Sequence, residues 1–243
     1  MNKAAIALVL AFLLAATPAL AKTALFVSDS PTELSTEENY LYNRITSMGY
    51  STLQIDDDRV YKNDSAWNSY RSQSDIIVVG DISQDFLNIS MGYREAFCGN
   101  LSSSKPMLIA FANTRYDGQI IGCAFSISAK DFDLVNYSDS SNQVSTKLGY
   151  VKDNSSYITK KYSSQYPSSE VKFYTSENNV SVVKSIYSSG TQLVSGYGKL
   201  PGDIVSDEYA AVISWDSPRR VFFGLDMPSL YTSDANNIFD RTV

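Results

Sequence analysis

The segment from Thr23 to Gly80 constrains the fold most, because its pattern predicts strand, helix, strand, short helix and strand in turn. The predicted strands cover Ala24–Val27, Ser51–Ile55 and Ile76–Val79. The last of these runs is apolar throughout, which is typical of a strand buried on both faces of a parallel sheet. Strand–helix–strand units within one sheet cross over with a right hand. The segment therefore predicts the start of a parallel α/β sheet.

The first predicted helix, Thr36–Met48, has clear signals at both ends. Ser35 and Glu38 have the spacing of a capping box, in which the two residues bond each other's backbone N–H groups. Gly49 stands where a helix commonly ends in a left-handed residue. One apolar stripe follows at helical spacing, formed by Leu41, Ile45 and Met48.

The middle of the chain predicts a fourth buried strand and then a change of pattern. A short helix at Met91–Phe97 precedes the apolar strand Met107–Ala112. Short β-prone runs follow between Ser, Asn and Gly turns, at Phe132–Tyr137, Val171–Tyr174, Val180–Tyr187 and Gln192–Tyr197. The Ser- and Tyr-rich segment Ser138–Ser169 is long, and we expect it to hold little regular structure.

The end of the sequence predicts a hairpin and a helix. The runs Glu208–Trp215 and Arg220–Leu225 are joined by a link so short that they must pair antiparallel. Ser233 is predicted to cap a last helix, Asp234–Thr242. The sequence stops at Val243 inside this predicted helix, which leaves open that it is the amino-terminal part of a longer protein.

Residues 1–21 have the parts of a secretory signal peptide: a positive start, the apolar core Ala4–Ala16, and an Ala-Leu-Ala triplet ending at Ala21. A membrane span is the alternative, but the core is too short and Pro18 interrupts it. We expect cleavage after Ala21 and a secreted or cell-surface chain. Residues 22–243 are long enough for a single domain.

The charge of the mature chain argues against two classes of partner. Without Lys3 of the leader, 19 basic residues face 26 acidic ones, a net charge of −7. No stretch clusters Lys or Arg, so we expect no nucleic acid or anionic membrane partner, and no membrane span in the mature chain. Surface proteins and glycans remain as expected partners, and the 17 tyrosines suit such contacts or simply pack half-buried strands.

The sequence predicts no cofactor and no metal. It contains neither the glycine-rich motif of dinucleotide-binding folds nor the lysine of a phosphate-binding loop. It has no histidine, and both of its cysteines are expected to form a disulfide, so the usual zinc ligands are missing. The run from Asp56 to Asp58 lacks the alternating acidic spacing and the glycine of a calcium loop, so a solvated loop is the preferred interpretation.

Export would give two kinds of residue a covalent role. The two cysteines, Cys98 and Cys123, are expected to form one disulfide, which would stabilise the fold by about 3 kcal/mol in the chain-entropy model. Six sequons are candidate glycan acceptors, although a chain rich in Asn, Ser and Thr also produces sequons by chance: Asn63, Asn88, Asn100, Asn136, Asn154 and Asn179.

The whole pattern resembles a secreted domain of the class I glutamine amidotransferase-like superfamily, which implies a flavodoxin-like α/β fold. The expected sheet is open, with parallel core strands, helices on both faces and an antiparallel C-terminal extension. The pieces that carry the resemblance are Ala24–Ser30 with Asn43–Ile45 and Leu53–Asp57, then Ser74–Gly80, and Arg219–Leu225 with Leu230–Tyr231 and Ile238–Phe239. Such strand patterns are specific for fold and say little about activity.

The catalytic residues of that superfamily have no counterpart here. Its enzymes use a cysteine on a G-x-C-x-G turn together with a histidine and a carboxylate. This chain has no histidine, and neither Cys98 nor Cys123 follows a buried strand. A cysteine–histidine pair therefore cannot be built, and we expect no cysteine-type amidotransferase chemistry.

Polar residues follow three of the predicted buried strands, where open parallel sheets bind ligands. These residues could converge on a sugar or another polar ligand, but the preferred interpretation is that they cap helices and satisfy turns. The preferred function is a non-catalytic exported or cell-surface domain with a structural or interaction role. The alternative is a carboxylate-dependent hydrolase of a polar substrate such as a glycan, with two of these carboxyl groups as acid and base. The candidate residues are Asp29, Ser30, Asp81, Asn113 and Arg115.

Overall fold

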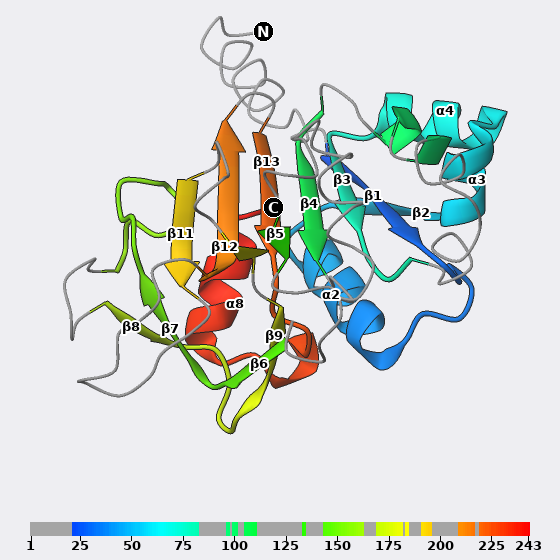
Figure 1. Cartoon of the computed structure of the whole chain (residues 1–243). Coiled ribbons are helices and arrows are strands. Elements are labelled where there is room, and N and C mark those ends of the chain that lie inside the picture. Colours follow the sequence, from blue (N-terminus) through cyan, green and yellow to red (C-terminus); the bar gives the residue numbers. More distant parts are fainter. Residues whose placement is uncertain are drawn as a thin grey trace, which may run out of the picture.

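A mixed sheet organises the fold, in the strand order β2-β1-β3-β4-β13-β12-β11-β7-β8 (Figure 1). The computed structural model describes residues 21–82, 96–97, 99–101, 105–110, 133–134, 143–162, 169–181, 183–184, 191–195, 209–216 and 219–243. The strands from β2 to β13 pair in parallel, and those from β12 onward pair antiparallel. The parallel part has the 2-1-3-4-5 order of flavodoxin-like folds.

The parallel strands match the sequence-based predictions closely. They are β1 (Thr23–Ser28), β2 (Ser51–Asp56), β3 (Ile76–Val79), β4 (Met107–Ala110) and β13 (Arg219–Phe223). Every residue of β3 and β4 is buried, because neighbouring strands cover their edges and other elements cover their faces. The predicted burial on both faces is therefore confirmed, while residues 111–112 of the fourth predicted strand lie outside the described residues.

Helices cover both faces of this sheet, as the predicted fold class requires. Alternate side chains of β1 point to opposite sides, so that Phe26 and Val27 belong to different apolar cores. The Phe26 core includes residues of α2 (Thr36–Ser47) and α8 (Ser233–Asp240). The Val27 core includes residues of α3 (Asp57–Lys62) and α4 (Ser65–Gln73). Figure 1 shows α2 and α8 lying together against the sheet.

The predicted ends of α2 are confirmed in atomic detail. The Ser35 side chain accepts a bond from the Glu38 backbone, and the Glu38 carboxylate accepts one from the Ser35 backbone, which completes the capping box. Gly49 has a φ of 92°, the left-handed conformation that favours glycine after a helix end.

Two helices stand where the sequence predicted one short helix. Asp56 and Asp64 cap α3 and α4 respectively, and each side chain accepts a bond from a backbone N–H of its helix. Asn63 lies between them with a φ of 50°, which turns the chain by the left-handed conformation that asparagine tolerates. Two helix caps and a turn thus lie within a short segment that was predicted to be one helix.

The prediction of little regular structure across Ser138–Ser169 is wrong. Two strands form there, β6 (Gln143–Thr146) and β7 (Leu148–Val151). Gly149 and Val151 are buried while Leu148 and Tyr150 are half-buried, an alternation of the kind that marks a strand with one covered face. The β7 strand extends the main sheet by pairing with β11 and β8, whereas β6 pairs with β9 in a separate two-stranded sheet.

The antiparallel region otherwise follows the prediction in outline. The hairpin of β12 (Tyr209–Asp216) and β13 is confirmed by a register that pairs Asp216 with Arg219. Within the described residues, the remaining β-prone runs contain the strands β5 (Asp133–Leu134), β8 (Glu170–Lys172), β9 (Asn178–Ser181), β10 (Val183–Lys184) and β11 (Thr191–Ser195). Of the helix predicted at Met91–Phe97, residues 96–97 are helical, and 91–95 lie outside the described residues.

The last helix begins and ends differently from the prediction. Its N-cap is Thr232 rather than Ser233, since the Thr232 hydroxyl accepts a bond from the Ala235 N–H. A short 3-10 helix, η3 (Pro228–Leu230), precedes it. The helix closes at Asp240 with Arg241 as C-cap, so the chain does not stop inside a helix at Val243.

A bidentate ion pair between Arg44 and Asp240 joins α2 to α8, and its contribution to stability can be tested. Arg44 Nε and Nη2 lie 2.7 and 2.8 Å from the two oxygens of Asp240, and the side chains are only 25% and 33% exposed. We expect Arg44→Met to lower the free energy of unfolding by about 1 kcal/mol, and Arg44→Lys to recover only part of it because a lysine cannot form the fork. A double-mutant cycle with Asp240→Asn measures the coupling, and additive single effects would contradict it.

Candidate functional site

The carboxyl ends of β1 and β3 are held together beyond the last paired strand residues. The Gly80 N–H donates to the Val27 carbonyl at 2.8 Å, and the Asp29 N–H donates to the Asp81 carbonyl at 2.9 Å. Asp29 and Asp81 therefore lie side by side at the edge of the sheet, and both residues are exposed. We call residues 28–30 and 80–82 the strand-end edge.

Glu38 of α2 connects the helix to this edge. Its carboxylate is buried, and Oε2 accepts bonds from the backbone and hydroxyl of Ser35, both at 3.0 Å. The other oxygen, Oε1, accepts a bond from the Asp81 N–H at 3.1 Å. The spacing of Ser35 and Glu38 in the sequence predicts only the helix-capping role of Glu38. Its second role depends on where the helix lies over the sheet, which a local sequence pattern does not contain.

Two small residues, Gly80 and Ser28, are buried at the strand-end edge. A Cβ atom built on Gly80 would approach Glu38 Oε1 to 2.9 Å and the Phe26 ring to 3.0 Å, so only glycine fits there without a shift of its neighbours. Ser28, which follows Val27 and its partner Val79 in the β1–β3 register, is fully buried. Its hydroxyl has no hydrogen-bond partner among the described residues, an uncommon state for a buried polar group.

Negative charges repel one another at the strand-end edge, where Glu38 and Asp29 lie near Asp81. Desolvation, followed by the negative charge of Glu38 and more weakly that of Asp29, raises the pKa of the Asp81 carboxyl. No described cation forms an ion pair with Asp29 or Asp81. The edge thus presents hydrogen-bond acceptors to solvent without a neutralising partner in the described part of the chain.

This repulsion predicts a pH-dependent gain from Asp81→Asn. A raised folded-state pKa means that the parent loses stability as the pH rises from about 4 through that pKa, because the folded state binds the proton more tightly. The asparagine variant avoids this loss, so it should be more stable at pH 7, by less than about 1 kcal/mol because solvent screens an exposed residue. Urea unfolding at about pH 3.5 and pH 7 measures the difference, which should vanish at the lower pH.

The matched control is Asp58→Asn, because Asp58 Oδ2 lies 2.6 Å from Lys62 Nζ and repulsion is absent from that pair. It should bring no gain at pH 7. A gain for Asp81→Asn that persists at the lower pH would contradict the electrostatic explanation.

Of the five candidate ligand-binding residues, the structure brings two together. Asp29 and Asp81 are neighbours, and Ser30 follows in a turn in which its carbonyl accepts the Glu33 N–H at 3.0 Å. Asn113 and Arg115 lie outside the described residues, as do Cys98 and Cys123. Two further residues were not among the predicted candidates: Ser28, which belongs to the strand-end edge, and Glu38, which accepts the Asp81 N–H.

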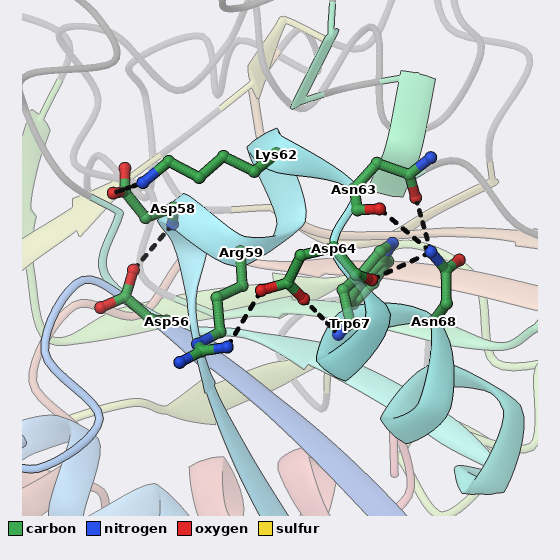
Figure 2. A network of polar contacts seen from close by, with 8 residues as sticks. All are labelled: Asp56, Asp58, Arg59, Lys62, Asn63, Asp64, Trp67 and Asn68. Carbon is green, nitrogen blue, oxygen red and sulfur yellow. Dashed lines mark hydrogen bonds and ion pairs between the residues drawn. The ribbon is translucent and has the colours of Figure 1, made fainter.

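The acidic run after β2 serves mainly to cap helices (Figure 2). Asp56, Asp57 and Asp58 each have one carboxylate oxygen that lies within 4.8 Å of the corresponding oxygens of the other two. However, Asp56 accepts a bond from the Asp58 N–H at 2.8 Å, and Asp58 pairs with Lys62. Further along, Asp64 pairs with Arg59 at 3.0 Å and caps α4. These contacts give Asp56, Asp58 and Asp64 structural roles at the ends and on the surface of α3 and α4.

The sequons differ in exposure where the structure describes them. Asn63 and Asn154 are exposed, Asn100 is half-buried, and the backbone of Asn179 lies in β9. Asn88 and Asn136 lie outside the described residues. Across the described ranges, the longest helices fall short of the length and apolar character needed to span a bilayer.

Comparison with known proteins supports the fold and leaves the activity open. No protein-family model and no curated protein matches the chain. The cytoplasmic proteins STM3548 from Salmonella typhimurium and STM1381 from Salmonella typhimurium LT2 match with TM-scores of 0.53 and 0.51 at 10% and 12% identity. These matches cover 90% of this chain in both cases, and 97% and 94% of the solved chains.

A third solved structure comes from Thermoplasma acidophilum and is provisionally described as one of the subunits of GMP synthase. It matches with a TM-score of 0.52 at 10% identity, over 91% of this chain and 92% of that chain. At such low sequence identity, structural similarity is evidence for the fold and not for the activity. The flavodoxin-like α/β class predicted from the sequence, as found in glutamine amidotransferase-like domains, is confirmed.

Proposed function

We propose that this chain is a non-catalytic exported or cell-surface domain that binds a polar ligand, such as a saccharide, at the strand-end edge. The observation that supports the proposal is the bond between the Asp29 N–H and the Asp81 carbonyl, at 2.9 Å. It holds two exposed carboxylates side by side, and neither has an ion-pair partner among the described residues. Sugar hydroxyl groups are suitable donors to such acceptors.

The absence of histidine from the chain supports a binding role over acyl transfer. The solved structure described as part of GMP synthase supports the resemblance to the glutamine amidotransferase-like superfamily at the level of fold. We propose membership without its catalytic triad, because the chain has no histidine to act as the general base next to a thiol.

Export rests on the leader at residues 1–21, and it makes a prediction about Cys98 and Cys123. The exported chain should start at Lys22 and contain one disulfide and no free thiol. Mass spectrometry after alkylation of the unfolded but unreduced protein is the measurement, and we expect no modified cysteine. Two alkylated cysteines in protein collected outside the cell would contradict the disulfide without affecting export, which N-terminal sequencing tests separately.

A hydrolase is the second candidate, because the raised pKa of Asp81 is what a general acid needs. Asp29 would then act as the general base or the nucleophile. The separation of the two carboxyl groups in a glycoside hydrolase depends on the mechanism, from about 5 Å when a glycosyl-enzyme forms to about 9 Å when a water attacks.

One experiment separates binding from hydrolysis. Labelled residues 22–243 are applied to a saccharide array, together with an Asp29→Asn/Asp81→Asn variant and an Asp56→Asn/Asp58→Asn control. We expect the parent and the control to bind the same saccharides and the first variant to lose at least about tenfold in affinity, equal to the loss of about 1.4 kcal/mol of binding free energy. Binding by all three alike, or by none, would contradict the site.

The bound saccharide is then incubated with the parent protein and analysed by mass. A binding domain leaves it intact. Cleavage that disappears in the Asp29→Asn/Asp81→Asn variant would replace the proposal by the hydrolase.

A further inference from the structure

A cavity of about 410 Å³ opens at the other end of the sheet, beside the segment 153–158. It lies where that segment meets β12 and the first residue of β13. Its lining residues are Asp153, Ser155, Ser156, Tyr157, Ile158, Ser214 and Arg219. All but Asp153, Arg219 and Ile158 are hydroxyl-bearing, which suits a ligand that exchanges hydrogen bonds with the protein.

The cavity is lined by residues on both sides of Asn154 in the sequence, Asp153 before it and Ser155 after it, while Asn154 itself is not a lining residue. Asn154 is exposed, and both residues that follow it in the sequon, Ser155 and Ser156, are lining residues. Two local bonds fix this part of the backbone. Asp153 Oδ1 accepts the Ser155 N–H at 2.8 Å, and Ser156 Oγ accepts the Ile158 N–H at 3.3 Å. A group attached to Asn154 would therefore start at the rim of the cavity.

Asn100 is in the opposite situation. Its amide nitrogen donates to the carbonyls of Val60 and Tyr61, both at 2.9 Å, and so uses both of its hydrogens. A glycosylated amide nitrogen keeps one hydrogen only, so a glycan there would break one of these bonds and push the side chain out of a half-buried position.

Asn63 provides a comparison that is exposed but fixed. Its side-chain carbonyl accepts a bond from Asn68 Nδ2 at 3.1 Å, and Figure 2 shows its amide nitrogen turned away from this contact. A glycan is sterically compatible with Asn63, and it would leave from the corner between α3 and α4, far in sequence from the cavity.

We propose that Asn154 carries an N-linked glycan whose first sugar occupies the cavity beside Tyr157; this inference rests on the export proposed above. The donor is a lipid-linked oligosaccharide (poly)phosphate of the secretory route. The Asn154 amide nitrogen forms a bond to the anomeric carbon, and the bond from that carbon to the lipid phosphate oxygen breaks. The lipid phosphate leaves with the electron pair, and a base of the transferase takes one amide proton.

The residues around Tyr157 provide contacts for this sugar. The Tyr157 ring is 60% exposed, which is high for a large aromatic side chain. Lys160 Nζ lies 4.2 Å and the Arg241 guanidinium 5.8 Å from the ring centroid. The ring offers an apolar surface with a polar tip, and the neighbouring Arg219 offers donors to sugar oxygens. A covalently held sugar gains these contacts at a high effective concentration.

The test expresses residues 22–243 behind a leader of the host in a secretory system that glycosylates sequons, so that failure of the native leader does not affect it. Glycopeptide mass spectrometry of the folded, secreted protein gives the occupancy of each sequon. We expect Asn154 to be occupied and Asn100 to be unmodified. An unoccupied Asn154 in folded protein would overturn the proposal, and so would an occupied Asn100 in protein with the parent's stability.

Enzymatic removal of the glycans tests whether the first sugar of the Asn154 glycan occupies the cavity. We expect removal to lower the Tm of the parent by about 2–4 °C, the shift that corresponds to loss of one good contact in a domain of this size. This decrease in Tm on glycan removal should be at least halved in Tyr157→Ala and in Asn154→Gln, and unchanged in Asn63→Gln. An equal loss in all four proteins would place the stabilising sugar elsewhere and overturn the inference. Binding at the strand-end edge, at the other end of the sheet, would stand or fall separately.

Discussion

Replacing Gly80 by alanine is expected to lower the free energy of unfolding by about 2–4 kcal/mol, because the new methyl group has no space. Its Cβ would lie 2.9 Å from Glu38 Oε1 and 3.0 Å from the Phe26 ring, and both neighbours are buried. Relief of the contact requires Glu38 to move, and that movement breaks its bond to the Asp81 N–H. Urea unfolding at pH 7 measures the loss as a lower midpoint with an unchanged slope.

Gly99→Ala is the matched control. Gly99 is exposed, lies in a helical turn, and has no atom within 4 Å of an added Cβ. Alanine is the better helix former, so this change should be neutral or stabilise by up to about 1 kcal/mol. If Gly80→Ala behaved like Gly99→Ala, the close packing of α2 against the end of β3 would be wrong.

Trp67→Ala is expected to destabilise the domain further, by about 3–5 kcal/mol, because it empties the largest buried side chain of the α3–α4 side. Trp67 is fully buried and packs in the core that includes Leu25, Val27 and Ile77. The Arg71 guanidinium lies 5.4 Å from its ring centroid. The variant should therefore unfold at a much lower urea concentration than the parent.

Trp67→Phe separates packing from polarity. In the part of the chain that the structure describes, the indole N–H of Trp67 has no hydrogen-bond partner. A phenylalanine would remove this buried polar group while filling part of the space. We expect Trp67→Phe to lose less than half of what Trp67→Ala loses. Similar losses for both variants would mean that the ring does not pack as described.

Local signals in the sequence predicted the parallel half of the fold well. The apolar runs of β1, β3 and β4 and the capping box at Ser35 each lie within a few residues of the element that they specify. The two helices α3 and α4 were predicted as one, because Asn63 supplies a left-handed turn without the glycine that usually announces it. The β6 and β7 strands were missed because polar residues and Gly149 separate the few apolar residues of Gln143–Val151.

The candidate site was predicted in part for a similar reason. Asp29 and Asp81 follow buried parallel strands, so their meeting at one edge follows from the topology. Glu38 and Gly80 meet because α2 crosses the sheet at one particular height, which no pattern of spacing encodes. Ser28 is fully buried, although serine is mostly exposed in folded proteins, and its position in the sequence does not indicate this burial.

The most direct test of the central claim is to map a bound saccharide onto the fold by amide chemical shifts. The nitrogen-15-labelled mature chain is titrated with the saccharide that binds most strongly on the array. We predict that the shifted amides cluster at residues 28–30 and 80–82, and that the shifts disappear in the Asp29→Asn/Asp81→Asn variant. Shifts centred on the cavity beside Tyr157, or unchanged in that variant, would contradict a ligand site at the carboxyl ends of β1 and β3.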